Sequence, residues 1–235
     1  MFFTYYNERN VFIYEKNNFK KTNGLINYWT FNGNVNDVIG NADLYDGVDA
    51  ALTLDRFERP NSALSLCTGY YKVRPGVYFS GTQFTIMAWV KVKSFKSNSR
   101  LIDFIDANGG NHIVLALSDY SDLKPYLYIQ SENKDIICFS TISLNLNQWH
   151  NLAYVFSFPF YSIYIDGTEI VMSEPQTTYD SFSLISVVRS SNFIGRSNFF
   201  DGLNDQDADA DFDDLKIFNR AFDQNEILFE MDNNI

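Results

Sequence analysis

The sequence predicts an all-β fold: an antiparallel β-sandwich of the jelly-roll type with one short C-terminal helix. Short apolar or alternating runs recur along the chain, and glycine, asparagine, aspartate and serine separate them, as in strands joined by turns. Aromatic residues make up 17% of the 235 residues, with 22 Phe and 15 Tyr, and such side chains pack well on pleated surfaces. A chain of this length can bury a full core as one domain.

The first segment of the chain, residues 1–23, is interpreted as an N-terminal extension or linker. Within it, two aromatic runs flank the polar "NERN", which is typical of a hairpin. Residues 24–235 are predicted to form the jelly-roll domain, because no repeat or low-complexity linker divides them. The expected strands include 84–92, 112–118, 126–131, 151–156 and 162–167.

Three local patterns refine these elements. Strand 84–92, "FTIMAWVKV", is largely apolar on both faces, which suits a central strand covered on both sides. The "YIDG" that closes the run at 162–167 is followed by Thr168 and predicts a tight Asp-Gly turn with a return strand. In "FDQNEILFE", Asp223 is expected to cap a helix and Glu226 to complete a capping box.

Charge limits the classes of partner. The formal net charge is -11 and the pI is near 4.5, so nucleic acid and anionic membrane surfaces would repel the protein, whereas a cation suits it. The apolar run Leu152–Ile165 is too short to cross a bilayer and contains Pro159, so we expect no membrane insertion. The N-terminus lacks the basic start and continuous apolar segment of a signal peptide.

The acidic tract near the C-terminus has an aspartate at every second position from Asp205 to Asp213. On one face of an extended strand such charges would sit about 7 Å apart, each pair costing about 0.6 kcal/mol even in water. We therefore expect either a solvated loop or carboxylates that converge on calcium. An EF-hand does not fit, because Ala210 and Lys216 occupy the positions of the required Gly and Glu. Alternation along "FDDLKIF" predicts that Asp213 faces the interior with Leu215 and Ile217.

Several stretches, taken in order, resemble concanavalin A-like, laminin-G-like jelly rolls. They are "GLINYWTFNGNVNDVIGNADLYDG" (24–47), "SALSL" (62–66), "FTIMAWVK" (84–91), "NQWHNLAYVF" (147–156), "YIDGTEI" (164–170), "NFIGRS" (192–197) and "FDDLKIFNRAFDQNEI" (212–227). The resemblance runs roughly from Gly24 to the C-terminus and implies that the first strand lies near the last. Domains of this family bind glycans, proteins or other domains, so fold alone does not fix function.

Calcium is the cofactor that the acidic residues suggest. With the first strand beside the last, the resemblance brings the "NDVIG" turn near the acidic tract. Asp37, Asp43, Asp211 and Asp213, with backbone carbonyls, would then form a structural Ca²⁺ site of oxygen ligands. The alternatives are that Asp37 and Asp213 accept backbone N–H bonds in turns, or that the tract is an isolated acidic loop.

Glycan binding needs exposed rings that stack on sugar faces, with polar groups for the hydroxyls. The candidate ligand-binding residues are Tyr70, Tyr71, Tyr120, Phe158, Phe160, Tyr161, Arg196, Phe199 and Phe200. The apolar turn "SFPFY" suggests a contact surface. The alternative is that these rings pack against neighbouring loops or the N-terminal extension, and that Arg196 forms an outward salt bridge.

Enzyme chemistry has little support. The Glu-x-Asp-x-x-Glu strand that glycoside hydrolases of this fold commonly carry is absent. His112 and His150 are interpreted as structural, and neither Cys67 nor Cys138 has a basic sequence neighbourhood that would activate a thiol. Both cysteines lie in strand-like stretches, where a free buried thiol is the usual outcome, although a disulfide stays open.

The sequence therefore predicts a non-catalytic, extracellular or cell-surface binding module, stabilised by calcium, that recognises a glycan or a glycosylated partner. The first alternative is a protein-interaction or spacer domain of a larger adhesion or receptor protein, without a sugar site. A glycosidase-associated domain is the second.

Overall fold

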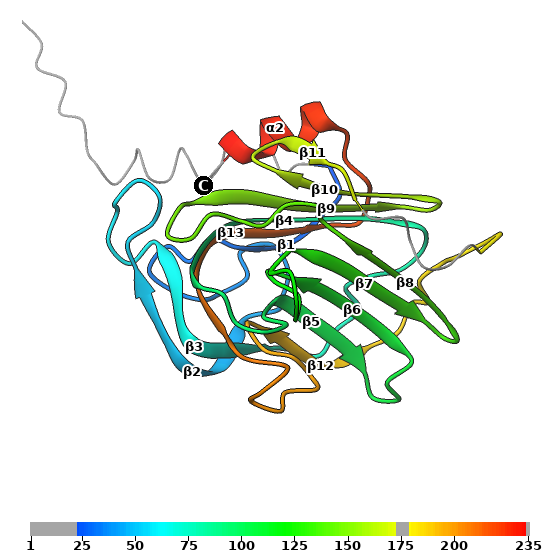
Figure 1. The fold of residues 1–235 in the computed structure, drawn as a ribbon, viewed down its shortest axis with the longest axis horizontal. Helices are drawn as coiled ribbons and strands as arrows, with labels where there is room; N and C mark the ends of the chain where they lie inside the picture. The colour runs from blue at the N-terminus through cyan, green and yellow to red at the C-terminus, as the bar shows by residue number, and fades with distance from the viewer. Residues whose placement is uncertain (1–22, 173–178, 234–235) are drawn as a thin grey trace, which may run out of the picture.

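The computed structural model describes residues 23–172 and 179–233, and antiparallel β-strands dominate it (Figure 1). The predicted all-β jelly-roll class is confirmed. The hairpin expected around "NERN" lies outside the described residues, and the first described strand begins at Leu25. No helix of the described residues is long and apolar enough to cross a membrane.

One continuous sheet curls back on itself into two layers (Figure 1). The first layer contains β1 (Leu25–Trp29), β4 (Gln83–Ser94), β9 (His150–Ser157), β10 (Phe160–Ile165), β11 (Thr168–Ile170) and β13 (Ala208–Phe218). The second layer contains β2 (Leu44–Thr53), β3 (Ala63–Val73), β5 (Arg100–Asp106), β6 (Asn111–Ala116), β7 (Tyr126–Ser131), β8 (Lys134–Phe139) and β12 (Arg189–Ile194).

Strand β13 joins the two layers. It pairs with β4 along one side; along the other its first half pairs with β3 and its second half with β1. The first strand therefore lies beside the last, as the family resemblance implied. Side chains that point between the layers form the main core, which includes Phe104, Phe156 and Phe212.

Strand β4 is covered on both faces, as its apolar pattern predicts. Phe84, Ile86 and Val90 lie in the main core between the layers. Met87, on the opposite face, packs with Ile227 in a second buried cluster beneath helix α2 (Gln224–Asp232).

Helix α2 forms where the capping box predicts it. The Asp223 side chain accepts from the Glu226 N–H, and the Glu226 side chain accepts from the Asp223 N–H. Lys216 Nζ of β13 donates to Glu230 Oε2 at 2.9 Å, and because both side chains are buried this ion pair fixes the helix to the sheet. Gly167, in the confirmed turn between β10 and β11, has φ of +72°, and a Cβ there would lie 2.4 Å from Leu228.

The predicted orientation of Asp213 is wrong. Strand β13 is irregular between Asp213 and Lys216, and Asp214 adopts a positive φ of 50°. Such a bulge shifts the alternation by one residue. Phe212 and Leu215 therefore both reach the core, while Asp213 lies on the opposite face of the strand, where it is buried against the Arg56 guanidinium.

Candidate functional site

The acidic tract is an ion-pair ladder. Its alternate carboxylates each meet a cation from another part of the chain, which offsets the repulsion between neighbouring charges. The pairs are Arg100–Asp205 at 2.6 Å, Arg196–Asp207 at 2.6 Å, Lys93–Asp209 at 3.5 Å, Lys91–Asp211 at 2.7 Å, and Arg56–Asp213. The expectation of a solvated loop is thus wrong, because the last three carboxylates lie within strand β13.

The four predicted calcium ligands do not form one group. Asp37 accepts from four backbone N–H groups and from Asn27 Nδ2, as in the turn alternative. Asp43 accepts from the Asp37 N–H, while Asp211 and Asp213 face lysine and arginine. The described residues contain no set of three or more His, Cys, Asp or Glu side chains that could hold a metal. Calcium binding stays a prediction.

Two carboxylates share one cation at the end of the ladder. Arg56 donates to Asp213 and, at 2.9 Å, to Asp214, and its guanidinium carbon lies 4.7 Å from the centroid of the Trp89 ring. Burial and the neighbouring charge of Asp214 raise the pKa of Asp213 to about 8.

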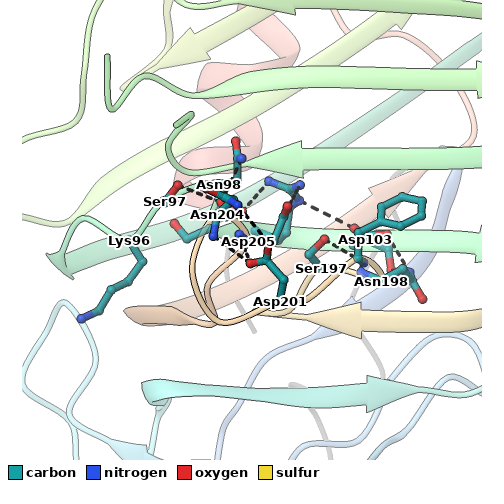
Figure 2. Close-up of polar contacts among 12 residues, drawn as sticks. Lys96, Ser97, Asn98, Asp103, Ser197, Asn198, Asp201, Asn204 and Asp205 are labelled. Carbon is teal, nitrogen blue, oxygen red and sulfur yellow. Dashed lines mark hydrogen bonds and ion pairs between the residues drawn. The ribbon is translucent and has the colours of Figure 1, made fainter. Parts of the chain in front are cut away.

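Three loops meet beyond the C-terminal end of β4; together they are called the loop cluster. They are residues 95–99, 117–125 and 195–207. Asn204 O accepts from Ser97 Oγ at 2.7 Å and from Asn98 Nδ2 at 3.0 Å, and the Asn98 N–H donates to Asp119 O at 3.5 Å (Figure 2). The first loop therefore holds the other two.

A buried polar network supports the loop cluster (Figure 2). Asp103 of β5 is fully buried, and its Oδ1 lies 2.5 Å from His112 Nε2 of β6. Asn198 donates to Asp103 through its backbone N–H and through Nδ2, at 3.1 and 2.7 Å. Arg100 spans Asp103 and Asp205. The long loop is thereby fixed to the sheet on both sides of its tip.

Sequence analysis did not identify this network. His112 was interpreted as structural, which its contact with Asp103 supports, but Asp103, Arg100 and Asn198 were not singled out. One signal was available: Asp103 interrupts the apolar run "LIDFI", and a carboxylate buried in a strand needs a partner.

Several predicted ligand-binding residues gather at the loop cluster. The exposed apolar side chains there include Tyr120 (66% exposed), Phe199 (65%), Phe200 (44%) and Leu203 (77%). Arg196 packs against two rings, with its guanidinium carbon 3.7 Å from the Tyr70 centroid and 4.2 Å from the Phe200 centroid. Nε and Nη2 of Arg196 donate to Asp207 at 2.8 and 2.6 Å, so Arg196 is engaged internally.

The remaining predicted ligand-binding residues lie elsewhere. Tyr71 packs against the core. Phe158 lies in the turn between β9 and β10, and Phe160 and Tyr161 are the first residues of β10; this end of the hairpin lies beside Gln83, at the opposite end of β4 from the loop cluster. Phe158 and Tyr161 also pack against the core, as the alternative reading had it, whereas Phe160 is 74% exposed.

The second histidine and the two thiols also have structural surroundings. His150 Nδ1 lies 2.8 Å from Asp166 Oδ2, at the turn that precedes β11. Both cysteines are free. Burial raises the pKa of Cys138 to about 12, which keeps that thiol unreactive, while Cys67 is exposed, contrary to the expectation of a buried thiol.

Comparison with known families agrees with this architecture. A model of the concanavalin A-like lectin/glucanases superfamily matches residues 67–228, more than half of the chain. The chain belongs to this superfamily. A search of curated proteins found no match.

Several solved structures share the fold. Domain 4 of AbnA, a GH43 extracellular arabinanase from Geobacillus stearothermophilus solved with arabinotriose, matches with a TM-score of 0.67 and 17% identity over 87% of this chain and 97% of that domain. The binding domain of Paraclostridial Mosquitocidal Protein 1 matches at 0.64 with 15% identity over 88% of this chain. The botulinum neurotoxin serotype G binding domain matches at 0.64 with 16% identity, also over 88% of this chain.

This concanavalin A-like chain covers 51% and 50% of the two toxin chains, about half their length. Identities of this size show a common fold. Two of these neighbours are named as binding domains, and the likeness to them shows the fold alone.

Proposed function

We propose that the domain is a non-catalytic module that binds a glycan at the loop cluster. The observation that carries the proposal is that Tyr120, Phe199 and Phe200 stand exposed on loops that a buried polar network holds in place. Aromatic faces of this kind stack on the C–H faces of sugars, and a fixed loop loses less conformational entropy on binding.

Ring placement supports the proposal further. Asn198, next to Phe199, accepts from Ser191 Oγ at 2.5 Å and donates to Asp103, so both ends of its amide are held. The Phe199 ring lies edge-on to His112, with centroids 5.6 Å apart. The exposed side chains of Asp201 and Asn204 lie in the same loop and offer polar groups to sugar hydroxyls. Domain 4 of AbnA, which shares the fold, was solved with a trisaccharide.

The test is a glycan array that includes arabinotriose, followed by calorimetry with the wild-type chain and two variants. Phe199→Ala and Tyr120→Ala are expected to weaken binding by about tenfold each, since truncated hot-spot side chains cost more than about 1 kcal/mol. Phe160→Ala is the matched control, because that ring is equally exposed at the other end of β4. Unchanged affinity in the first two variants would refute the site, and an array without any bound glycan would refute the function.

Protein binding is the second candidate, and Phe160 is the observation that favours it. This exposed ring stands at the turn between β9 and β10, next to exposed Pro159. An apolar turn tip of this kind suits a protein partner. The test is a pull-down from extracellular matrix extracts with the wild-type chain and both variants. Protein bands that are lost with Phe160→Ala and kept with Phe199→Ala would favour an adhesion or spacer role over the glycan site.

An extracellular or cell-surface location and structural calcium complete the proposal. Both rest on the sequence: the family resemblance for the location and the carboxylate-rich composition for the ion.

A further inference from the structure

Three cations at the loop cluster are already paired with carboxylates. Arg196 is bound through two nitrogens to Asp207, Arg100 lies 2.6 Å from Asp205, and Lys124 lies 3.1 Å from Asp122. Lys96, the other lysine of these loops, extends away from the Asp201 turn in Figure 2. The described part of the loop cluster therefore directs no unpaired guanidinium toward the exposed rings.

Carboxylates, in contrast, face the solvent beside the rings. Asp201 is exposed, and its Oδ1 accepts the backbone N–H groups of Leu203, Asn204 and Asp205 at 2.9, 2.7 and 3.0 Å. These bonds lower the pKa of Asp201 to about 2, so it carries its charge across the physiological range. The side chain of Asp122 is 61% exposed. The formal net charge of the whole chain is also negative, at -11.

We propose that the glycan site described above, on whose existence this inference depends, takes an uncharged sugar and rejects sugars that carry a carboxylate or a sulfate. Hydroxyl groups donate to carboxylates, so a neutral sugar meets acceptors at the rim and rings at the centre. An anionic sugar meets like charge there, while Arg196, Arg100 and Lys124 are already paired with carboxylates of the protein.

Arg196 cannot readily leave its ion pair with Asp207 to bind an anionic ligand. Arg196 could serve an anionic ligand only by leaving Asp207, which is 5% exposed, and by giving up its packing on Tyr70 and Phe200. A buried carboxylate left without its partner is costly. Arg196 is therefore a positioning residue for Phe200, and Asp207 sets the selectivity by holding it.

The experiment compares matched glycan pairs that differ only in one acidic group: the same oligosaccharide with and without a terminal sialic acid, and a neutral glycan with its uronate form. We expect the neutral member to bind at least about tenfold more tightly. Its affinity should stay constant from about 0.05 to about 0.5 M NaCl, whereas residual binding of the acidic member should strengthen as salt screens the repulsion.

Two variants test the cause. Asp122→Asn removes an exposed carboxylate and leaves Lys124 unpaired, and Asp207→Asn weakens the ion pair with Arg196. In each variant the affinity ratio of the neutral to the acidic member of a glycan pair should fall to under about threefold. Asp122 is at the surface, so this variant remains informative even when Asp207→Asn fails to fold. Equal or tighter binding of the acidic members by wild type would overturn this inference alone. Absence of binding to every neutral and acidic glycan would overturn the proposed function with it.

Discussion

At the scale of single residues, Arg56 is the side chain on which most buried charge depends. It is 6% exposed and pairs with Asp213 and Asp214, whose side chains are 2% and 5% exposed. Tyr28 also donates its hydroxyl to Asp214. Because the pKa of Asp213 is raised to about 8, Asp213 is largely protonated at pH 7, and removal of the guanidinium would leave the buried Asp214 carboxylate with the neutral Tyr28 donor alone.

We expect Arg56→Ala to lower the free energy of unfolding by about 3 to 5 kcal/mol at pH 7, because it leaves the buried Asp214 carboxylate without its cation. Urea denaturation measures the change. Lys72→Ala is the control: Lys72 and its partner Asp46 are 38% and 63% exposed, and surface pairs contribute only about 0 to 1 kcal/mol. Equal losses in both variants would contradict the special role of Arg56.

The protonation of Asp213 gives the stability a pH dependence. The pKa of Asp213 rises from 3.8 to about 8 on folding, because of burial and the charge of Asp214. The folded protein therefore holds a proton that the unfolded chain releases, and this stabilisation is fully present below 3.8 and is lost as pH rises through about 8.

Between these values the free energy of unfolding should fall with pH by up to about 1.4 kcal/mol per unit for the one proton. Asp213→Asn carries no titratable group and keeps the Arg56–Asp214 pair, so its stability should vary less between pH 5 and pH 8. Urea melts at several pH values measure both curves. Parallel curves for wild type and variant would show that Asp213 has no raised pKa.

At the scale of elements, the sequence correctly predicted those strands and the helix whose pattern lies within the element itself. The runs at 126–131 and 151–156 lie within strands β7 and β9, and the capping box places helix α2. Strand β13 was harder, because its bulge depends on Asp214, whose positive φ no neighbouring residue indicates. Its charge partners come from other strands and loops, with Arg56 157 residues away from Asp213, so local periodicity gives no information about them.

The same limit applies to the candidate site. Tyr120 and Phe199 were predicted as ligand-binding residues because an aromatic residue within a polar loop can be recognised from the sequence. Their grouping depends on three loops that are far apart in the chain, and the Asp103–Asn198 contact spans 95 residues. Phe158 and Tyr161 had the same local appearance, yet both pack against the core, because exposure depends on tertiary neighbours.

The cap of helix α2 can be tested by itself. Asp223→Ala removes the acceptor for the Glu226 N–H and should cost about 1 kcal/mol in the free energy of unfolding. Asp232→Ala, an exposed change in the last turn, should cost close to nothing. Thermal melting of both variants measures the difference, and a larger effect at Asp232 would contradict the capping role.

At the scale of the whole molecule, structural calcium is a prediction that melting can decide. A metal present at 100 times its dissociation constant, bound only by the folded state, adds about 2.7 kcal/mol. Calcium should then raise the melting temperature relative to EDTA, and Asp43→Asn or Asp211→Asn should reduce the shift. Identical melting temperatures in calcium and EDTA would reject the prediction. These carboxylates would then interact only with donor groups of the protein itself.

Strand β13 also determines when the molecule can complete its fold. It supplies a pairing partner of both β3 and β4, yet it begins only at Ala208, far along the chain from these two strands. During synthesis β3 and β4 therefore each keep one open edge until β13 has been made. Until then they present unpaired backbone groups to other nascent chains. Closure of the sandwich therefore has to wait for β13, and Lys91, Lys93 and Arg56 gain their carboxylate partners only when this strand docks.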